Sequence, residues 1–400
     1  MSAPTRREPG LGWSALWRMA LCAVVFVVVY GGCNRFTSTR SDVGVYMFSW
    51  ERHIPFVREM VIPYWSLDLF FCGAFFLCAS RAKLNLLTMR LVAVTLASGA
   101  CFLIFPLKAG LPRPVPEGWT APLFTLLYQN DMPYNMAPSL HISLRSLVWI
   151  VYGARLTGWT RKVAKIWFIL IGLSTLLVWQ HHLVDVATGF LMGWLVAAVI
   201  RDREADWVAT PSAKLAYRYG AGALACAALS FGWIGFAWPA AACGIIALAY
   251  ATGRASLLGK ENGTLSPSAE WCLLPVILVR WIVQRKWLAR VPGWREVAPG
   301  VWVGRKPNRR EAELLVREGP LSVLDLTSES NAPVAFRERA VYRNIPMLDL
   351  VAPHPSQLDA AATFITGQLA AGRRVFVHCQ LGIERSVKTV DYWLGTQVPP

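Results

Sequence analysis

Long apolar runs are the feature of this sequence that most limits what the chain can fold into. There are eight of them, and each comes close to the roughly 20 residues that a helix needs to cross a bilayer. The first is too long for a signal peptide and lacks a cleavage-site pattern. We predict transmembrane helices at about residues 13–30, 60–80, 87–106, 142–157, 164–180, 184–200, 217–236 and 238–253, the last two joined by a tight turn at Trp238-Pro239.

The composition also indicates a membrane protein. Of the 400 residues, 55% are hydrophobic, only 16% are charged and 19 are tryptophan, which is unlike an average soluble domain. A net charge of +16 would suggest a nucleic-acid partner in a soluble chain. Here Lys and Arg stand between the apolar runs, where they set topology and meet anionic headgroups. We expect a polytopic α-helical protein of a bacterial inner membrane that binds no nucleic acid.

Basic residues between the runs predict the orientation of the chain. One side of the predicted spans carries most of them, which assigns that side to the cytoplasm. They are Arg6, Arg7, Arg81, Lys83, Arg155, Arg161, Lys162, Arg201, Arg203, Arg254 and Lys260. The loop over residues 34–59 is the exception, because its arginines fall on the opposite side.

The composition changes after the last run. Residues 267–286 are apolar but are interrupted by Pro275 and Arg280, which suits a helix lying in the membrane interface. From about residue 290 the sequence is that of a soluble domain. Apolar strand patterns and a helical pattern predict an α/β layer there. The strands are expected at 301–304, 322–326 and 375–377, and the helix at 357–369.

These observations predict five segments. They are an N-terminal tail with the first transmembrane helix (1–50), a catalytic membrane domain (51–205), an extra transmembrane helix pair (206–260), an interfacial linker (261–295) and a C-terminal cytoplasmic α/β domain (296–400).

The stretch VFVHCQLGIERS, at residues 375–386, is the sharpest chemical signal. A strand, a loop and a helix start place Cys379 at the base of inward-pointing backbone N–H groups, which can hold a tetrahedral oxyanion. The same groups favour a thiolate, which can attack phosphorus. Arg385 can bind two phosphate oxygens at once. The alternative is a buried structural cysteine followed by an unrelated arginine.

Cysteine usage bears on the compartment and on cofactors. The thiolate needs a reducing environment, so we expect its domain to be cytoplasmic. The nine cysteines lack metal or disulfide spacing, and most lie within apolar runs. We expect no metal and no other cofactor.

The pattern His378-Cys379-x-x-Gly382-x-x-Arg385-Ser386 resembles the signature of the dual-specificity and tyrosine phosphatases that use a cysteine nucleophile. The resemblance implies that Cys379 forms a phosphocysteine and that Gly382 and Arg385 hold the phosphate. It also implies that Ser386 stabilises the leaving thiolate and that His378 orients the loop from behind. Glu384 places a negative charge near the anion, which could bias substrate choice.

The same resemblance implies a carboxylic acid that protonates the leaving oxygen. Asp349, 30 residues before Cys379, is the best placed candidate, in a loop that can move. Asp325 belongs to a predicted strand and is expected to be structural. Related domains continue with further helices beyond this point, so we expect either a minimal domain packed on the interfacial helix or a truncated one.

Two stretches of the membrane body carry polar groups that hydrocarbon tolerates only for a reason. They are NMAPSLH, residues 135–141, and HHLVD, residues 181–185, both at predicted extracytoplasmic helix ends. His181 and Asp185 are four residues apart, so on a helix the carboxylate can fix the imidazole tautomer. His182 competes for Asp185 at a spacing of three. These groups suit a nucleophilic or proton-transferring histidine.

Further residues could complete this second site. His141 could protonate a leaving oxygen, and Ser139 with the amides of the helix start could receive phosphate. Arg113 and Lys108 could bind the negative charge. A lone H-x-x-x-D pattern would more often be a polar cap, but P-S-x-H on the preceding span favours a site.

The motifs P-S-x-H and H-x-x-x-D resemble those of the type 2 phosphatidic acid phosphatase (PAP2) superfamily. The branch with sphingomyelin-synthase-like and inositol-phosphotransferase-like members is the most similar, because Ser174-Thr175 stands where the hydrolases have Ser-Arg. Lys108-x4-Arg113-Pro114 is a shortened form of the superfamily's first motif. The resemblance implies a phosphohistidine on His181, but it leaves phosphate ligation less defined than the His–Asp pair.

The sequence therefore predicts a membrane phosphatase with two sites. The outer site would act on a lipid phosphate through His181, and the inner one on a phospholipid or phosphoprotein through Cys379. One alternative is a transferase of lipid phospho-headgroups in the membrane domain. Another is a catalytically inactive membrane scaffold or sensor. A transporter is less consistent, because the polar residues gather at one face and not at the midplane.

Overall fold

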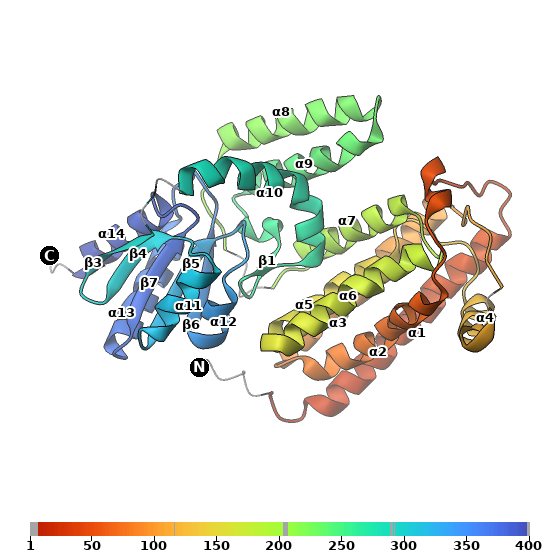
Figure 1. The fold of residues 1–400 in the computed structure, drawn as a ribbon, viewed down its shortest axis with the longest axis horizontal. Coiled ribbons are helices and arrows are strands. Elements are labelled where there is room, and N and C mark those ends of the chain that lie inside the picture. Colours follow the sequence, from red (N-terminus) through yellow and green to blue (C-terminus); the bar gives the residue numbers. More distant parts are fainter. Residues whose placement is uncertain (1–6, 116, 203–206, 289–290, 292, 398–400) are drawn as a thin grey trace. The chain divides into compact units, whose positions relative to one another are not determined.

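The computed structural model describes residues 7–397 except residues 116, 203–206, 289, 290 and 292. The chain divides into two compact units, residues 5–200 and residues 201–400. Figure 1 labels the helices and strands of both units.

The first unit is helical. Its helices are α1 (Leu11–Ser38), α2 (Val61–Leu77), α3 (Arg81–Ile104), α4 (Ala121–Asn130), α5 (Leu140–Arg155), α6 (Gly158–Leu177) and α7 (Leu183–Val199). Short 3-10 turns occur at Ser49–His53, Arg58–Met60 and Gly118–Thr120. Helix α5 packs against α2, α3, α6 and α7, so it lies at the centre of the bundle. Leu84, Leu147, Val148 and Phe168 are buried in the shared core.

Serine caps fix where two of these helices begin. Ser80 accepts a hydrogen bond from the N–H of Lys83 at 3.3 Å before α3. Ser139 accepts one from the N–H of Ile142 at 3.3 Å before α5. A side-chain oxygen at this position satisfies an N–H that has no partner within the helix. The cap of α5 therefore fixes the helix start that carries the P-S-x-H motif.

Helices occur at all eight positions where spans are predicted. Among the described residues, four segments are long and apolar enough to cross a membrane. They are Leu11–Ser38, Arg58–Leu77, Arg81–Ile104 and Ile234–Thr252, and Leu183–Val199 is a shorter apolar helix. Eight membrane crossings stay a prediction.

The predicted turn at Trp238-Pro239 is wrong. The second unit begins with α8 (Ala213–Ser230) and α9 (Ala237–Thr252), so both residues lie in the first turn of α9. The chain reverses before them, through the 3-10 turn Ile234–Phe236. Proline suits a first turn, because the N–H that it lacks would have no helical acceptor there.

A short connection follows this helix pair. It contains a 3-10 turn (Ala255–Leu258) and the two-stranded hairpin β1 (Lys260–Glu261) and β2 (Thr264–Leu265). Helix α10 (Pro267–Leu288) comes next, where the interfacial helix is predicted, and it packs against α9.

The remaining residues form an α/β domain around a five-stranded sheet. The strands are β3 (Trp294–Ala298), β4 (Val301–Arg305), β5 (Leu321–Thr327), β6 (Val341–Met347) and β7 (Arg374–Cys379), in the order β3-β4-β7-β5-β6. Strand β3 is antiparallel to β4, and β4, β7, β5 and β6 are parallel. The strands predicted at 301–304, 322–326 and 375–377 are confirmed.

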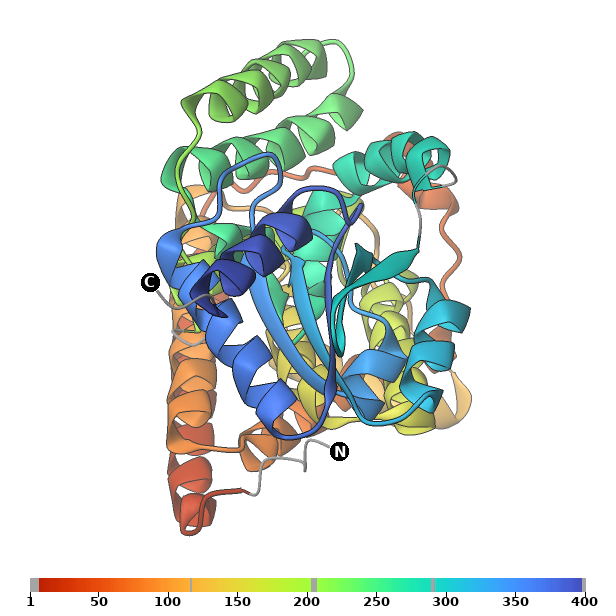
Figure 2. The same cartoon turned by 90° about the vertical axis from the view of Figure 1, so that its left-hand side faces the viewer.

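Helices cover both faces of this sheet. They are α11 (Arg309–Arg317), α12 (Val334–Arg339), α13 (Pro355–Ala370) and α14 (Arg385–Gln397). α13, the predicted helix, and α14 pack over one face, with Val375 and Val377 (Figure 2, α13 in medium blue and α14 in dark blue). α11 and α12 pack over the other face, with Phe376. The central strand β7 is thus buried on both sides, which explains its unbroken apolar sequence. Its carboxyl end carries Cys379.

Candidate active sites

The Cys379 thiol lies at the base of a loop between β7 and α14. The N–H of Gly382 donates to Cys379 Sγ at 3.2 Å, and Ser386 Oγ lies 3.4 Å from the same sulfur. Gly382 has a φ of 72°, and a Cβ there would come within 2.4 Å of the backbone of Gly304 and Arg305. Only glycine fits this close approach. The loop brings together the residues that the motif predicts.

Arg385 is buried under the loop and held by an acid that the sequence analysis missed. Its Nη2 and Nη1 donate to the two carboxylate oxygens of Glu329 at 2.7 and 3.0 Å, and Nη1 also donates to the Met347 carbonyl at 2.9 Å. Arg385 Nε has no partner among the described residues. A fork of this kind fixes the guanidinium plane. The unpartnered Nε–H of Arg385 is suited to bind an anion.

Glu329 and Arg385 each stabilise the ionised form of the other. Burial alone would raise the pKa of Glu329, but Arg385 holds it well below its usual range. Burial likewise opposes the charge of Arg385, and Glu329 outweighs it, so the pKa of Arg385 is raised. Both groups are therefore ionised at neutral pH.

Asp349 lies at the same site, just after β6. Its Oδ1 is 3.1 Å from Arg385 Nη2, and its side chain is 39% exposed. Burial raises the pKa of Asp349, although Arg385 acts in the opposite direction. A carboxyl group that keeps its proton to higher pH is suited to proton donation. Asp349 is therefore close enough to Arg385 to act on a phosphate held there.

Asp325 belongs to a buried network and not to the loop. Its carboxylate accepts from Lys260 Nζ at 2.7 Å, from Tyr342 Oη at 2.7 Å and from the N–H of Thr327 at 2.8 Å. His378 Nε2 lies 3.9 Å from it, and burial lowers the pKa of His378 to about 4. A neutral His378 behind the strand fits a role in supporting the loop. Lys260, from the hairpin before α10, was not predicted here.

Glu384 has a cation of its own. Its carboxylate accepts a hydrogen bond from Lys388 Nζ at 2.7 Å, one turn along the helix. The negative charge expected near the anion is thus paired at the surface.

In the first unit, a tight turn presents His181. The N–H groups of Gln180 and His181 donate to the Thr175 carbonyl at 3.1 and 3.0 Å. His181 Nδ1 lies 3.5 Å from Asp185 Oδ2, and this oxygen accepts from the N–H of His182 at 2.7 Å. The two motif residues are therefore adjacent, and Thr175 contributes its backbone to the turn.

His182 has different partners. Its Nε2 accepts from the N–H of Gly110 at 2.9 Å, and its Nδ1 lies 3.5 Å from Glu51 Oε2. Glu51 also accepts from the N–H of Leu183 at 2.9 Å. His182 thus joins three separate segments, and this geometry favours His181 as the partner of Asp185.

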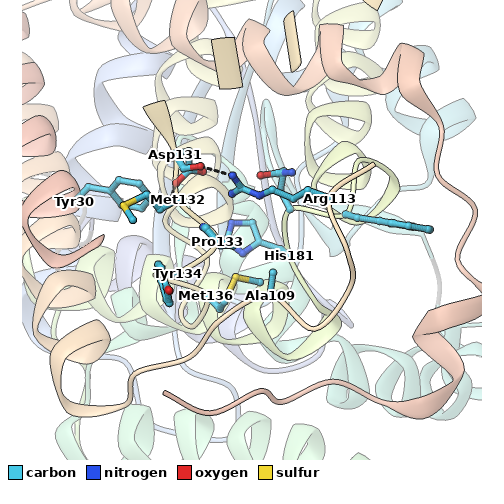
Figure 3. A pocket seen from close by; sticks show the side chains of 11 residues that line it. Tyr30, Ala109, Arg113, Asp131, Met132, Pro133, Tyr134, Met136 and His181 are labelled. Carbon is cyan, nitrogen blue, oxygen red and sulfur yellow. Dashed lines mark hydrogen bonds between the residues drawn. The ribbon is translucent and has the colours of Figure 1, made fainter. Parts of the chain in front are cut away.

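A small pocket opens beside His181 (Figure 3). Arg113 lines it, donates from Nη1 to the Asp131 carbonyl at 2.5 Å and lies over the ring of Tyr128. Asp131 also lines it, and its Oδ1 accepts from Tyr30 Oη and Asn34 Nδ2, each at 2.9 Å. Asp131 was missed, although an acid in the loop before P-S-x-H is a visible signal. The pocket unites a histidine, an arginine and a carboxylate.

The other predicted residues of this site lie around the pocket without lining it. Ser139 donates from its N–H to the Asp185 carbonyl at 2.9 Å, which joins the two motifs. His141 stacks on Tyr64 with the ring centroids 4.3 Å apart, and its Nε2 is buried without a partner among the described residues. Lys108 is exposed. The structure therefore brings His181, Asp185 and Arg113 together, and leaves Lys108 outside the pocket.

A comparison with protein-family models identifies part of the membrane body. Residues 87–206 match the sequence model of the PAP2 superfamily, a range that contains Arg113, Ser139, His141, His181 and Asp185. A search of curated proteins gives no match. The match does not reach the α/β domain, so its cysteine-phosphatase character stays a prediction, as does the branch of the superfamily. Residues 87–206 of this chain are thus a PAP2 superfamily domain, part of a membrane-associated helical fold.

Proposed function

We propose that this protein is a membrane phosphatase with two independent sites. The PAP2 superfamily acts on phosphate esters as phosphatases or phosphotransferases. The first site is the His181 pocket, acting on a lipid phosphate at the extracytoplasmic face. The second is the Cys379 loop, acting on a phosphomonoester at the cytoplasmic face.

One observation carries the proposal for the second site: the thiol, its loop amide and an arginine with an unpartnered donor meet around one position. Cys379 Sγ attacks phosphorus, and Asp349 gives its proton to the leaving oxygen as the P–O bond breaks. Water then attacks the phosphocysteine and gives its proton to Asp349, now a carboxylate. Ser386 Oγ stabilises the departing thiolate, and inorganic phosphate is released.

The first site follows the same logic with a different nucleophile. His181 attacks phosphorus through Nε2, while Asp185 stabilises the charge that develops on the ring. Arg113 faces the same pocket and neutralises the phosphate oxygens. His141 protonates the leaving oxygen, a role that requires its ring to reach the substrate. Water then attacks the phosphohistidine and gives its proton to His141, while the N–P bond breaks and inorganic phosphate is released.

A transferase is the second candidate for the membrane domain. It is favoured by Thr175, which stands where an arginine would otherwise bind phosphate and is buried with its hydroxyl donating to the Gly172 carbonyl. A pocket with fewer cations suits the single negative charge of a phospho-headgroup diester better than the two negative charges of a phosphate monoester. A lipid labelled in its headgroup distinguishes the two, since transfer moves the label to a second lipid.

The test is phosphate release by the purified full-length protein from a panel of lipid phosphates and a soluble aryl phosphate. Wild type is compared with Cys379→Ser, His181→Ala and the double variant. Cys226→Ser and His53→Ala serve as matched controls, because these residues lie outside both sites. We expect the activity to split between the two single variants with different substrates. Turnover that survives in the double variant would favour the inactive scaffold.

A further inference from the structure

The α/β domain is attached to apolar helices through its catalytic loops. Tyr250, in the last turn of α9, donates from Oη to the backbone carbonyl of Asp349 at 3.1 Å. Tyr219 of α8 stacks on Tyr250 with the ring centroids 5.7 Å apart. The segment Ile234–Thr252 is long and apolar enough to cross a membrane. The residue proposed as the acid is therefore held directly by a candidate span.

Helix α10 makes two more contacts with the same loops. Arg280 Nη2 donates to the Glu329 carbonyl at 2.7 Å. Gln284 Oε1 accepts from Gln380 Nε2, in the loop after Cys379, at 3.0 Å. The two residues are one turn apart, so a single face of α10 contacts both the acid that holds Arg385 and the loop that holds the thiol.

The opposite side of α10 is apolar and exposed. Leu278, Val279, Ile282 and Val283 are 52–62% exposed and lie on one stripe of the helix. α10 packs on α9, and Trp238 Nε1 donates to the Trp271 carbonyl at 2.9 Å. The exposed stripe thus belongs to the same helical assembly as a candidate span. Its occupant is the lipid bilayer, because apolar surface continuous with a span has lipid as its neighbour.

The rim of the site is also apolar. Leu350, next to Asp349, is 67% exposed, and Ile383, within the Cys379 loop, is 55% exposed. Lys306 brings a basic residue next to this loop, because its backbone N–H donates to the Gln380 carbonyl at 3.3 Å, and burial lowers the pKa of its side chain to about 8. Cations combined with exposed apolar side chains match a phosphate carried on a lipid.

We propose that the Cys379 site hydrolyses the phosphomonoester of a lipid that stays in the bilayer, with its apolar part against Leu350 and Ile383. A soluble phosphopeptide is the competing substrate. This inference rests on the proposed function of the Cys379 site and specifies its substrate.

The experiment uses the full-length His181→Ala protein in phosphatidylcholine vesicles, so that only the Cys379 site acts. Three substrates are compared: phosphatidate or phosphatidylglycerol phosphate in the vesicles, glycerol 3-phosphate in solution, and a phosphotyrosine peptide. We expect kcat/KM for a vesicle lipid to exceed that for either soluble substrate at least about tenfold. Equal or faster hydrolysis of the peptide or of glycerol 3-phosphate would overturn the inference and leave the proposed function intact. No release that depends on Cys379 from any substrate, p-nitrophenyl phosphate included, would remove both.

A double variant tests the bilayer contact separately. Val279→Ser with Ile282→Ser should lower hydrolysis of the vesicle lipid about fivefold or more, and leave p-nitrophenyl phosphate hydrolysis unchanged. Leu314→Ser on α11 is the matched control, because Leu314 is also about half exposed. Equal loss on both substrates would show that the stripe only stabilises the fold, against the inference.

Discussion

The two sites of this chain differ in how they are encoded. At the Cys379 site, the proposed nucleophile, the loop amide and the arginine come from seven consecutive residues, and one glycine conformation sets their geometry. At the His181 site, the groups come from separate helices and loops, and the pocket exists only when these pack. A loop that is local in sequence can be recognised from its residues, whereas an assembled pocket can be recognised only in part.

The largest expected effect tests whether the assembled site depends on one histidine. His181→Asn should lower turnover of a lipid phosphate at this site by at least about 10³-fold, because the nucleophile is lost. His182→Asn should keep most of the turnover and lower the melting temperature, since His182 bonds to Gly110 and lies beside Glu51. Both are measured in the Cys379→Ser background. The reverse ranking would assign the nucleophile to His182.

The loop after Cys379 should be most sensitive to substitution at Gly382. Gly382→Ala places a Cβ within 2.4 Å of neighbouring backbone, and a shift of about 1 Å in the loop should cost about 10²-fold in kcat. Gly372→Ala is the matched control, because Gly372 has a similar φ of 69° but nothing within 4 Å of the added atom. Equal activity of the two variants would show that backbone strain, and not close approach, decides the effect.

Asp349 gives a prediction for pH. The proposed acid acts only when protonated, and its pKa is raised, chiefly by burial. We therefore expect kcat/KM at the Cys379 site to fall as pH rises through this raised pKa. Asp349→Asn should remove this decrease in kcat/KM with pH and lower the rate about 10²-fold. A decrease that persists in the variant would assign the acid to another group.

Glu329 is expected to give the smallest of these effects. Glu329→Gln keeps the shape but removes a charge-assisted partner of Arg385, which should raise KM about tenfold for a phosphomonoester. Glu311→Gln is the control, because Glu311 makes a similar fork with Arg305 closer to the surface. A change in kcat with constant KM would indicate that Glu329 acts on the chemical step.

Local patterns account for most of the fold that could be predicted. The alternation and length of apolar segments located β4, β5, β7, α13 and the helices of the membrane body. The turn at Trp238-Pro239 was wrong because proline fits the first turn of a helix as well as a reversal between helices. Periodicity alone does not distinguish these two positions.

Apart from Asp349, the predicted site residues were those that share a short motif. Glu329, Asp131, Glu51 and Lys260 were missed, and each acts on a residue at least 50 positions away, as Glu329 does on Arg385. Spacing along the chain carries no information about such pairs until the fold is known. Burial explains why these residues pair with one another, because an ionised side chain in the interior needs a partner.

The ion pair between Lys260 and Asp325 limits how the α/β domain can be separated from the hairpin that precedes it. The ammonium of Lys260, contributed by the hairpin that follows α9, bonds to Asp325 and Thr327 in the interior of the α/β domain. A gene fragment starting at residue 294, where β3 begins, would encode the sheet without this cation, and an unpaired buried carboxylate costs about 3–5 kcal/mol. Recombination could therefore not transfer the α/β domain to a new host protein without also carrying the hairpin or replacing Asp325. The α/β domain and the hairpin that follows α9 are therefore expected to be inherited as one unit.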